Sequence, residues 1–166
     1  MEKVIPRAEH KWLQNIAGNW TYEFECSMGP DLPPEKSSGP MSARMLGDVW
    51  VVMESESKAP QSGETVHSVW TLGFDPQKER VVGSFVCSVM TYFWTYNGKI
   101  DFDSNTMTLD APGPGFGDPS RIVDYQDIIQ FIDQDYFVLR SQMKLESGEW
   151  VPFMRGDYRR TTKTIN

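Results

Sequence analysis

A strict alternation of apolar and polar residues begins at Trp20, and it constrains the fold of this chain more than any other feature. The apolar members are Trp20, Tyr22, Phe24, Cys26 and Met28, with polar residues between them. Successive side chains of a β-strand point to opposite faces, so the pattern predicts a strand with one buried face and one wet face. Aromatic residues make up 13% of the chain, which also favours strands.

Similar short apolar runs continue to the end of the chain, and turn-forming residues separate them about every 8–12 residues. We expect loops or turns at residues 29–40, at Asn97-Gly98 and at 111–117, where glycine and proline gather. Closing such a meander into a barrel removes its exposed strand edges. We therefore expect one all-β domain over residues 1–166, an antiparallel barrel of about nine or ten strands.

Residues 8–17 are the best helix candidate in the sequence. Trp12, Leu13 and Ile16 fall on one face of such a helix, and Gly18 follows as a natural stop. A short helix must dock on other structure to persist, so we expect it to plug one end of the barrel.

The two ends of the chain carry a recognisable pattern. Gly18-Asn19-Trp20 opens the first strand, and Tyr158-Arg159-Arg160 closes the last one. This resembles the lipocalin and fatty-acid-binding (calycin) pattern, in which the tryptophan plugs the barrel base and a basic residue of the last strand packs over it. The resemblance implies a lipocalin-like barrel closed by Trp20 and Arg160 through a cation–π contact, with Arg159 pointing outward.

The middle of the chain is similar to a bacterial family of lipocalin-like proteins catalogued as a domain of unknown function. The residues that carry this similarity are Thr71-Leu72-Gly73-Phe74-Asp75, Trp94, Gly98-Lys99-Ile100-Asp101, Thr108-Leu109 and the ending from Met154 to Arg160. The similarity covers about Leu13 to Arg160 and departs at Gln126, where we expect the family to carry arginine. It implies the fold and brings no activity and no cofactor.

Strand parity, counted from an inward-facing Trp20, selects the side chains expected to line the barrel interior. These candidate ligand-binding residues are Tyr22, Phe24, Met28, Trp70, Tyr92, Trp94, Tyr125, Asp127, Phe137 and Met154. Aromatic surroundings with a few polar groups are typical of small-molecule sites, and also of filled cores. Asp127 is the exceptional member, because a buried carboxylate must be hydrogen-bonded, paired or protonated. It is either a structural hydrogen-bonding group or an anchor for a ligand.

The sequence offers no catalytic centre and no metal site. Its two histidines, His10 and His67, are too few for a three-histidine site, and we expect both to be exposed. No histidine lies near the C-terminal strands, which lowers the case for haem. We therefore expect no cofactor and favour a protein that is not an enzyme.

The charge and the N-terminal residues bear on partners and location. A formal net charge of −7 argues against nucleic acid and anionic membrane partners, because their phosphates repel an acidic protein. Residues 1–7 are charged and contain Pro6, unlike a signal peptide, and no stretch predicts a transmembrane helix. We expect Cys26 and Cys87 to remain thiols, and we expect the protein in the cytoplasm.

Three functions remain open from the sequence. The leading hypothesis is a binding protein that holds a small hydrophobic or aromatic ligand in the barrel, with the loop from Pro112 to Gly117 gating its mouth. The second is a structural or interaction protein with a filled core, which includes a homodimer formed through an exposed strand face. The third is an enzyme that uses Asp127 and Tyr125 as acid–base groups in the cavity.

Overall fold

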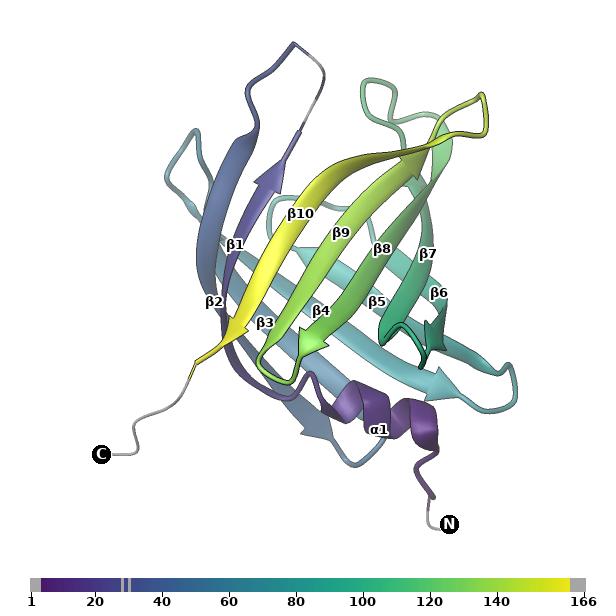
Figure 1. Cartoon of the computed structure of the whole chain (residues 1–166). Helices are drawn as coiled ribbons and strands as arrows, with labels where there is room; N and C mark the ends of the chain where they lie inside the picture. The colour runs from purple at the N-terminus through teal and green to yellow at the C-terminus, as the bar shows by residue number, and fades with distance from the viewer. Residues whose placement is uncertain (1–3, 28, 30, 162–166) are drawn as a thin grey trace.

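Ten strands form a closed barrel in which every strand is antiparallel to both of its neighbours (Figure 1). The structure is a computed structural model that describes residues 4–27, 29 and 31–161. The strands are β1 (Gly18–Cys26), β2 (Glu35–Leu46), β3 (Trp50–Lys58), β4 (Thr65–Asp75), β5 (Arg80–Cys87), β6 (Trp94–Asp101), β7 (Thr106–Pro114), β8 (Ile122–Asp133), β9 (Tyr136–Lys144) and β10 (Trp150–Arg160). The expected antiparallel barrel is confirmed.

The barrel closes where the first strand meets the last. β1 pairs with β2 on one side and with β10 on the other, and Trp20 lies directly opposite Arg160 in the β1–β10 register. Consecutive strands are neighbours everywhere else in the ring, so the chain winds around the barrel as a simple meander. Within this ring no strand is left with an open edge.

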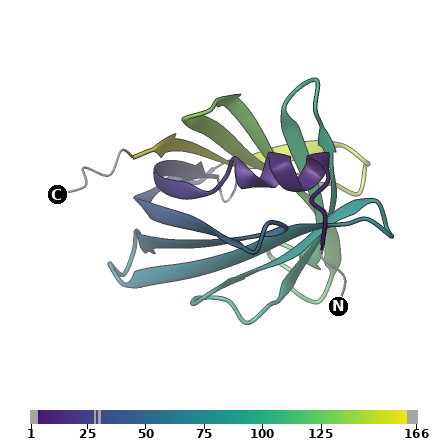
Figure 2. The ribbon, with the colours of Figure 1, turned by 90° about the horizontal axis from the view of Figure 1, so that it is seen from below.

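One short helix, α1 (Ala8–Gln14), lies across the lower opening of the barrel (Figures 1 and 2). Its Trp12 and Leu13 are buried, and the indole Nε1 of Trp12 donates to Asn105 Oδ1 over 2.7 Å in the β6–β7 turn. The helix is shorter than the predicted 8–17, because residues 15–17 tighten into i→i−3 hydrogen bonds before Gly18. Within the described residues, no helix is long and apolar enough to cross a membrane.

His10 corrects one expectation, because it is buried and not exposed. The Nδ1 atom of His10 accepts from the Arg7 backbone N–H over 2.9 Å, so Nε2 carries the proton and faces the Phe74 carbonyl oxygen at 3.1 Å. The ring also packs edge-on against Phe74. His10 therefore ties α1 to the end of β4. His67 is exposed, as expected.

Three segments predicted as loops or turns lie inside strands instead. Gly39-Pro40 belongs to β2, Asn97-Gly98 belongs to β6, and residues 111–114 extend β7, which leaves only residues 115–121 between β7 and β8. The glycines in these segments allow the neighbouring backbone to approach closely, and they do not form turns. A Cβ atom on Gly39 would lie 1.8 Å from the Glu56 carbonyl oxygen, and one on Gly98 would lie 2.4 Å from that of Thr108.

The side chains around Trp20 are closely packed and almost completely shielded from solvent. Trp20 itself is 1% exposed. Its buried neighbours in the hydrophobic core include Val51, Leu72, Val81, Met107, Leu109, Ile129, Phe131 and Phe137, none more than 5% exposed. Phe131 and Phe137 contact the Trp20 ring edge-on, with centroids 6.3 and 4.7 Å away. The lower half of the barrel is therefore a packed core, and a site inside the barrel has to lie above it.

Candidate functional site

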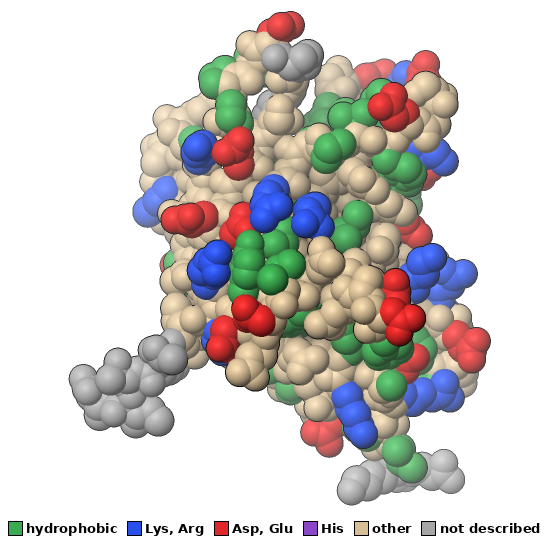
Figure 3. Space-filling model, in the orientation of Figure 1, with side chains coloured by type: hydrophobic (Ala, Val, Ile, Leu, Met, Phe, Trp, Pro, Cys, Tyr) green, Lys and Arg blue, Asp and Glu red, His purple; other side chains and the backbone are tan. Residues whose placement is uncertain are grey.

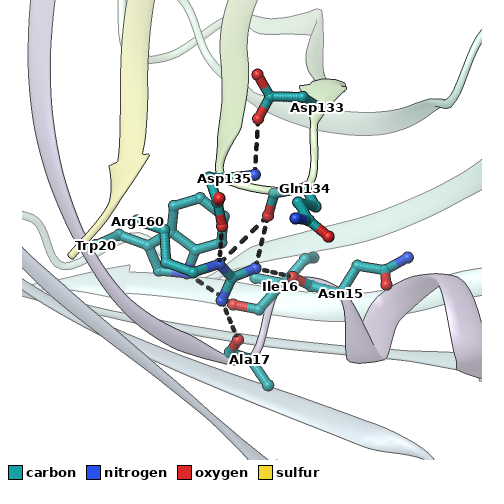
Figure 4. A network of polar contacts seen from close by, with 8 residues as sticks. All are labelled: Asn15, Ile16, Ala17, Trp20, Asp133, Gln134, Asp135 and Arg160. Carbon is teal, nitrogen blue, oxygen red and sulfur yellow. Dashed lines mark hydrogen bonds and ion pairs between the residues drawn. The ribbon is translucent and has the colours of Figure 1, made fainter. Parts of the chain in front are cut away.

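Arg160 holds the closed end of the barrel together (Figure 4). Its guanidinium carbon lies 4.2 Å from the centroid of the Trp20 ring. The same group donates to the backbone carbonyl oxygens of Ala17 (2.7 Å), Asn15 (2.9 Å) and Gln134 (2.9 Å), and to Asp135 Oδ1 (3.1 Å). The Trp20 indole N–H donates to the Ile16 carbonyl over 2.8 Å. These contacts join the segment after α1, both strands of the seam and the β8–β9 turn, so Trp20 and Arg160 serve to close the barrel.

Gly18 leaves the space that Arg160 needs. Its φ of +133° is a backbone conformation that favours glycine, and a Cβ atom there would lie 2.4 Å from Nη1 of Arg160. The glycine of the Gly-x-Trp pattern is thus required both by its own backbone and by the arginine on the far strand.

Inward-facing side chains in the upper half of the barrel are only half-buried, in contrast to those around Trp20. Phe24, Trp70, Trp94, Asp127 and Met154 all belong to this group. Tyr92 precedes β6 and is also half-buried, whereas Tyr22, Tyr125 and Phe137 are buried. Met28 lies outside the described residues. The half-buried members of the predicted set thus lie in the upper half of the barrel, whereas Phe137 belongs to the packed layer around Trp20.

Asp127 lies at the centre of a polar cluster inside this upper half. Its Oδ2 accepts a hydrogen bond of 2.7 Å from the Tyr96 hydroxyl, and its Oδ1 accepts one from the Ser141 hydroxyl. Ser141 faces Asp127 directly in the β8–β9 register, while Tyr96 reaches across from β6. Each carboxylate oxygen thus accepts one hydrogen bond from a hydroxyl group, which fills about half of the lone-pair sites of an ionised carboxylate.

The surroundings of this cluster shift the pKa values of its ionisable side chains. Burial raises the pKa of Asp127, and the hydrogen bonds from Ser141 and Tyr96 partly oppose that shift. Burial, together with the Asp127 charge, raises the pKa of Tyr96 well above its usual value. Burial also raises the pKa of Tyr158, which lies close enough to feel the Asp127 charge. The hydroxyls of both tyrosines are therefore donors at neutral pH.

Tyr125 does not join Asp127, although both face inward on β8. The Tyr125 hydroxyl donates to the Pro114 carbonyl oxygen over 2.7 Å instead. Its ring belongs to an aromatic cluster at the upper end that comprises Tyr92, Trp94, Phe116, Tyr125 and Phe153. The acid–base pair considered from the sequence is not formed in this arrangement.

Trp94 carries an unpaired donor. Its indole Nε1 is buried and has no hydrogen-bond partner among the described residues. The opposite edge of the ring covers Gly113, where a Cβ atom would lie 2.1 Å from Cζ3. A buried N–H without a partner costs free energy, and such groups are rare in folded proteins.

Between the packed layer and this upper half lies a small enclosed space of about 20 Å³. It is lined by Met41, Met53, Ser55, Trp70, Ile129, Phe137, Leu139 and Tyr158. A space of that size holds about one water molecule, so it marks the floor of a candidate site rather than the site itself.

A second hollow, an open groove of about 770 Å³, lies over β2, β1, β10 and β9, where outward-facing charged residues line it together with Phe24, Phe153 and Met154. Figure 3 shows Lys, Arg, Asp and Glu side chains mixed on this face. They pair with one another: Lys36 Nζ lies 3.4 Å from Glu25 Oε2, and Arg155 Nη2 lies 2.9 Å from Asp157 Oδ1. These pairs neutralise the groove, and we assign no site to it. No cluster of metal-ligating side chains is found in residues 4–27, 29 and 31–161.

Two aromatic residues of the upper half, Phe153 and Phe85, were missed from the sequence. Phe153 contacts Tyr125 because β10 is irregular between Pro152 and Met154, which turns an extra side chain inward. Phe85 packs edge-on against Trp70 at 5.3 Å. Tyr96 and Ser141 share the parity of inward-facing residues, but their contact with Asp127 depends on strand register, which alternation alone does not reveal.

The solved structures that resemble 95% of this chain include the following two. One is the S-type phycobiliprotein lyase CPES from Guillardia theta, with a TM-score of 0.64, 13% identity and 95% coverage of both chains. The other is Rv2717c from M. tuberculosis, with a TM-score of 0.60, 12% identity, and coverage of 95% of this chain and 100% of that one. At these identities the likeness shows the fold alone. No curated protein matches the chain.

A family model matches residues 5–160, almost the whole length that the barrel and α1 occupy. It describes a protein of unknown function, DUF1579, in agreement with the resemblance noted from the sequence. The chain therefore belongs to the DUF1579 family.

Proposed function

We propose that this protein binds a small hydrophobic or aromatic ligand in the upper half of the barrel. The carrying observation is the graded burial of inward-facing side chains. Trp20 and its neighbours have almost no exposed surface, whereas Phe24, Trp70 and Trp94 are only half-buried. A ligand seated above the packed layer would cover this apolar surface, which is a favourable change of about 25 cal/mol per Å².

The loops around the upper opening support the same proposal. Large apolar side chains there are exposed: Val89 (62%) and Phe93 (59%) between β5 and β6, and Phe116 (44%) between β7 and β8. Exposed apolar residues gathered at one place are typical of entrances and binding sites. Residues 115–117 are the part of the predicted gate that remains a loop, and Phe116 within them contacts Tyr125.

The competing functions have less support. An acid–base mechanism through Asp127 and Tyr125 needs the two side chains to cooperate, but each bonds a different partner. No feature of the described residues favours a homodimer. The net charge of −7 supports a partner that is neither nucleic acid nor an anionic membrane, and a reducing cytoplasm suits Cys26 and Cys87 as thiols.

Native mass spectrometry of the freshly purified protein, with a denatured control, is the first experiment. A non-covalent adduct of small-molecule mass that is lost on denaturation supports the proposal. The same spectrum distinguishes a monomer from a homodimer.

A blocking variant then tests where the ligand lies. Ser68 faces inward on β4, opposite Ser55, while the adjacent His67 is exposed. Ser68→Phe should fill the site and weaken binding of 1-naphthalenemethanol, a neutral aromatic probe, by about tenfold or more, which corresponds to about 1.4 kcal/mol. His67→Phe, which adds a similar ring on the outside, should leave binding unchanged. Equal affinity in the two variants would contradict a site inside the barrel.

A further inference from the structure

Among the described inward-facing residues of the upper half, Asp127 is the one acidic side chain that lies below the rim of the barrel. Strand parity places uncharged residues at the neighbouring inward positions, such as Ser55, Trp70, Phe85 and Met154. Glu35 lies at the rim, where Gln61 Nε2 bonds it over 3.1 Å. The inward-facing cation of the described residues, Arg160, lies at the closed end beneath the Trp20 ring and pairs with Asp135.

The hydrogen bonds of Asp127 satisfy its geometry but leave its charge uncompensated. Both partners, the Tyr96 and Ser141 hydroxyls, are neutral. The effects that act on its proton equilibrium are burial and these two hydroxyls, with no contribution from a basic side chain. A carboxyl group buried in a protein is normally either protonated or paired with a cation, because an ionised carboxylate loses its hydration on burial.

Aromatic rings surround this carboxylate on the side of the half-buried surface. The Tyr96 ring, which bonds Asp127, lies 6.0 Å from the Trp70 ring, and Trp70 lies 5.3 Å from Phe85. On the opposite wall, Tyr158 is stacked on Phe137 at 4.5 Å. The faces of aromatic rings carry negative potential and attract organic cations, and a nearby carboxylate adds to that attraction.

We propose that the ligand of this barrel is an organic cation, an apolar or aromatic molecule that carries a positively charged amine, with Asp127 as its counter-ion. This inference rests on the proposed function and specifies the class of ligand. It also predicts that the site rejects hydrophobic carboxylates, since no inward-facing lysine or arginine of the described residues accompanies Asp127 in the upper half.

Three probes of one size test the charge preference. They are 1-naphthylmethylamine, which is an ammonium ion at pH 7, 1-naphthalenemethanol, which is neutral, and 1-naphthoate, which is an anion. Isothermal titration calorimetry on the wild-type protein should rank them in that order. The ammonium ion should bind about tenfold more tightly than the alcohol, within the range expected for a desolvated cation–π and ion-pair contact.

Two variants that each remove one carboxylate test whether the preference for the ammonium ion depends on Asp127. Asp127→Asn should abolish the preference for the ammonium ion and improve binding of the naphthoate. Asp124→Asn removes a carboxylate from the exposed side of the same strand and should leave the preference intact. This control separates a local counter-ion from the general attraction of an acidic protein for cations.

Each outcome supports or overturns either the inferred class of ligand or the proposed binding function. If the alcohol binds but the ammonium ion binds no better, or if Asp127→Asn retains the full preference, the inference is overturned and the proposed binding function stands. If the naphthoate binds most tightly, the inference is likewise overturned. If none of the three probes binds, the proposed function falls and this inference falls with it. The order of the three probe affinities is measured on the wild-type protein, so the inference can still be tested if Asp127→Asn does not fold.

Discussion

Arg160 and Trp20 face each other across the β1–β10 seam, and the guanidinium of one lies 4.2 Å above the ring of the other. The arginine also donates hydrogen bonds to backbone carbonyl oxygens just after α1 and in the β8–β9 turn. A single side chain thus connects the helix, the seam and the last hairpin. Its loss affects all three at once.

Arg160→Ala should lower the free energy of unfolding by about 3 kcal/mol, since it removes a cation–π contact and leaves several carbonyl oxygens without a donor. Arg159 is the matched control, because it points outward and lies 4.0 Å over the exposed side of Tyr136. Arg159→Ala should cost less than about 1 kcal/mol. Urea unfolding of the two variants measures the difference, and similar losses would contradict a special role for Arg160.

Gly18→Ala should destabilise the protein through two effects, a backbone conformation unfavourable for alanine and a collision with Arg160. Gly63→Ala is a reference for alanine at a positive φ without a collision, because Gly63 has a φ of +72° and no heavy atom lies within 4 Å of a Cβ atom placed there. We expect about 1 kcal/mol at Gly63 and clearly more at Gly18. In an Arg160→Ala background the excess at Gly18 should shrink, and a double-mutant cycle measures that coupling.

Trp94→Phe should cost little, within about 1 kcal/mol of wild type, because it removes an indole N–H that has no partner among the described residues. Trp12→Phe removes an N–H that bonds Asn105 over 2.7 Å, and leaves that amide oxygen without its donor. We expect a loss of about 1–3 kcal/mol there. Thermal unfolding followed by circular dichroism compares the two, and an equal or larger loss at Trp94 would show that its N–H is bonded.

The stability of Asp127→Asn relative to wild type should rise with pH. Burial raises the pKa of Asp127 above its usual 3.8, so the folded protein holds this proton more tightly than the unfolded chain does. Wild type therefore loses stability as pH rises from 3.8 through the folded pKa, whereas the asparagine variant does not.

Asp157→Asn should show the opposite dependence of stability on pH in the same measurement. Its hydrogen bond from Arg155 lowers the pKa of Asp157, so its stabilisation is present above 3.8 and is lost as pH falls through the folded pKa. Its variant should be weaker than wild type at pH 7 and should approach it near pH 3. Urea unfolding at both pH values gives the two trends, and parallel trends would contradict the assignments.

The alternation of apolar and polar residues in the sequence was enough to indicate which face of a regular strand points into the barrel. Tyr22 on β1 and Phe137 on β9 are buried there, because a strand has a period of two whatever its neighbours are. The Gly-x-Trp pattern and the terminal arginine similarly pointed to the closed end, since both ends of a meander must meet in a closed barrel.

Glycine was the main source of error in the prediction. Gly98 and Gly113 looked like turn residues, yet they lie in strands beneath Thr108 and Trp94, where no side chain fits. A single sequence does not distinguish a glycine that bends the chain from one that makes room for a neighbour. The contacts of Asp127 were also out of reach, because Tyr96 comes from a strand that is not adjacent to β8.

The seam between β1 and β10 also has a consequence for how the chain acquires its structure. Trp20 lies in the first strand of the barrel to leave the ribosome, but its cross-strand partner Arg160 is among the last residues of the barrel to appear. Throughout synthesis, β1 can pair only with β2, and its other edge stays available to foreign strands. Ring closure therefore waits for the final strand and depends on contacts distant in sequence, which makes folding slow. A nascent chain stalled before Arg160 would be an open sheet, a natural target for chaperones or for aggregation.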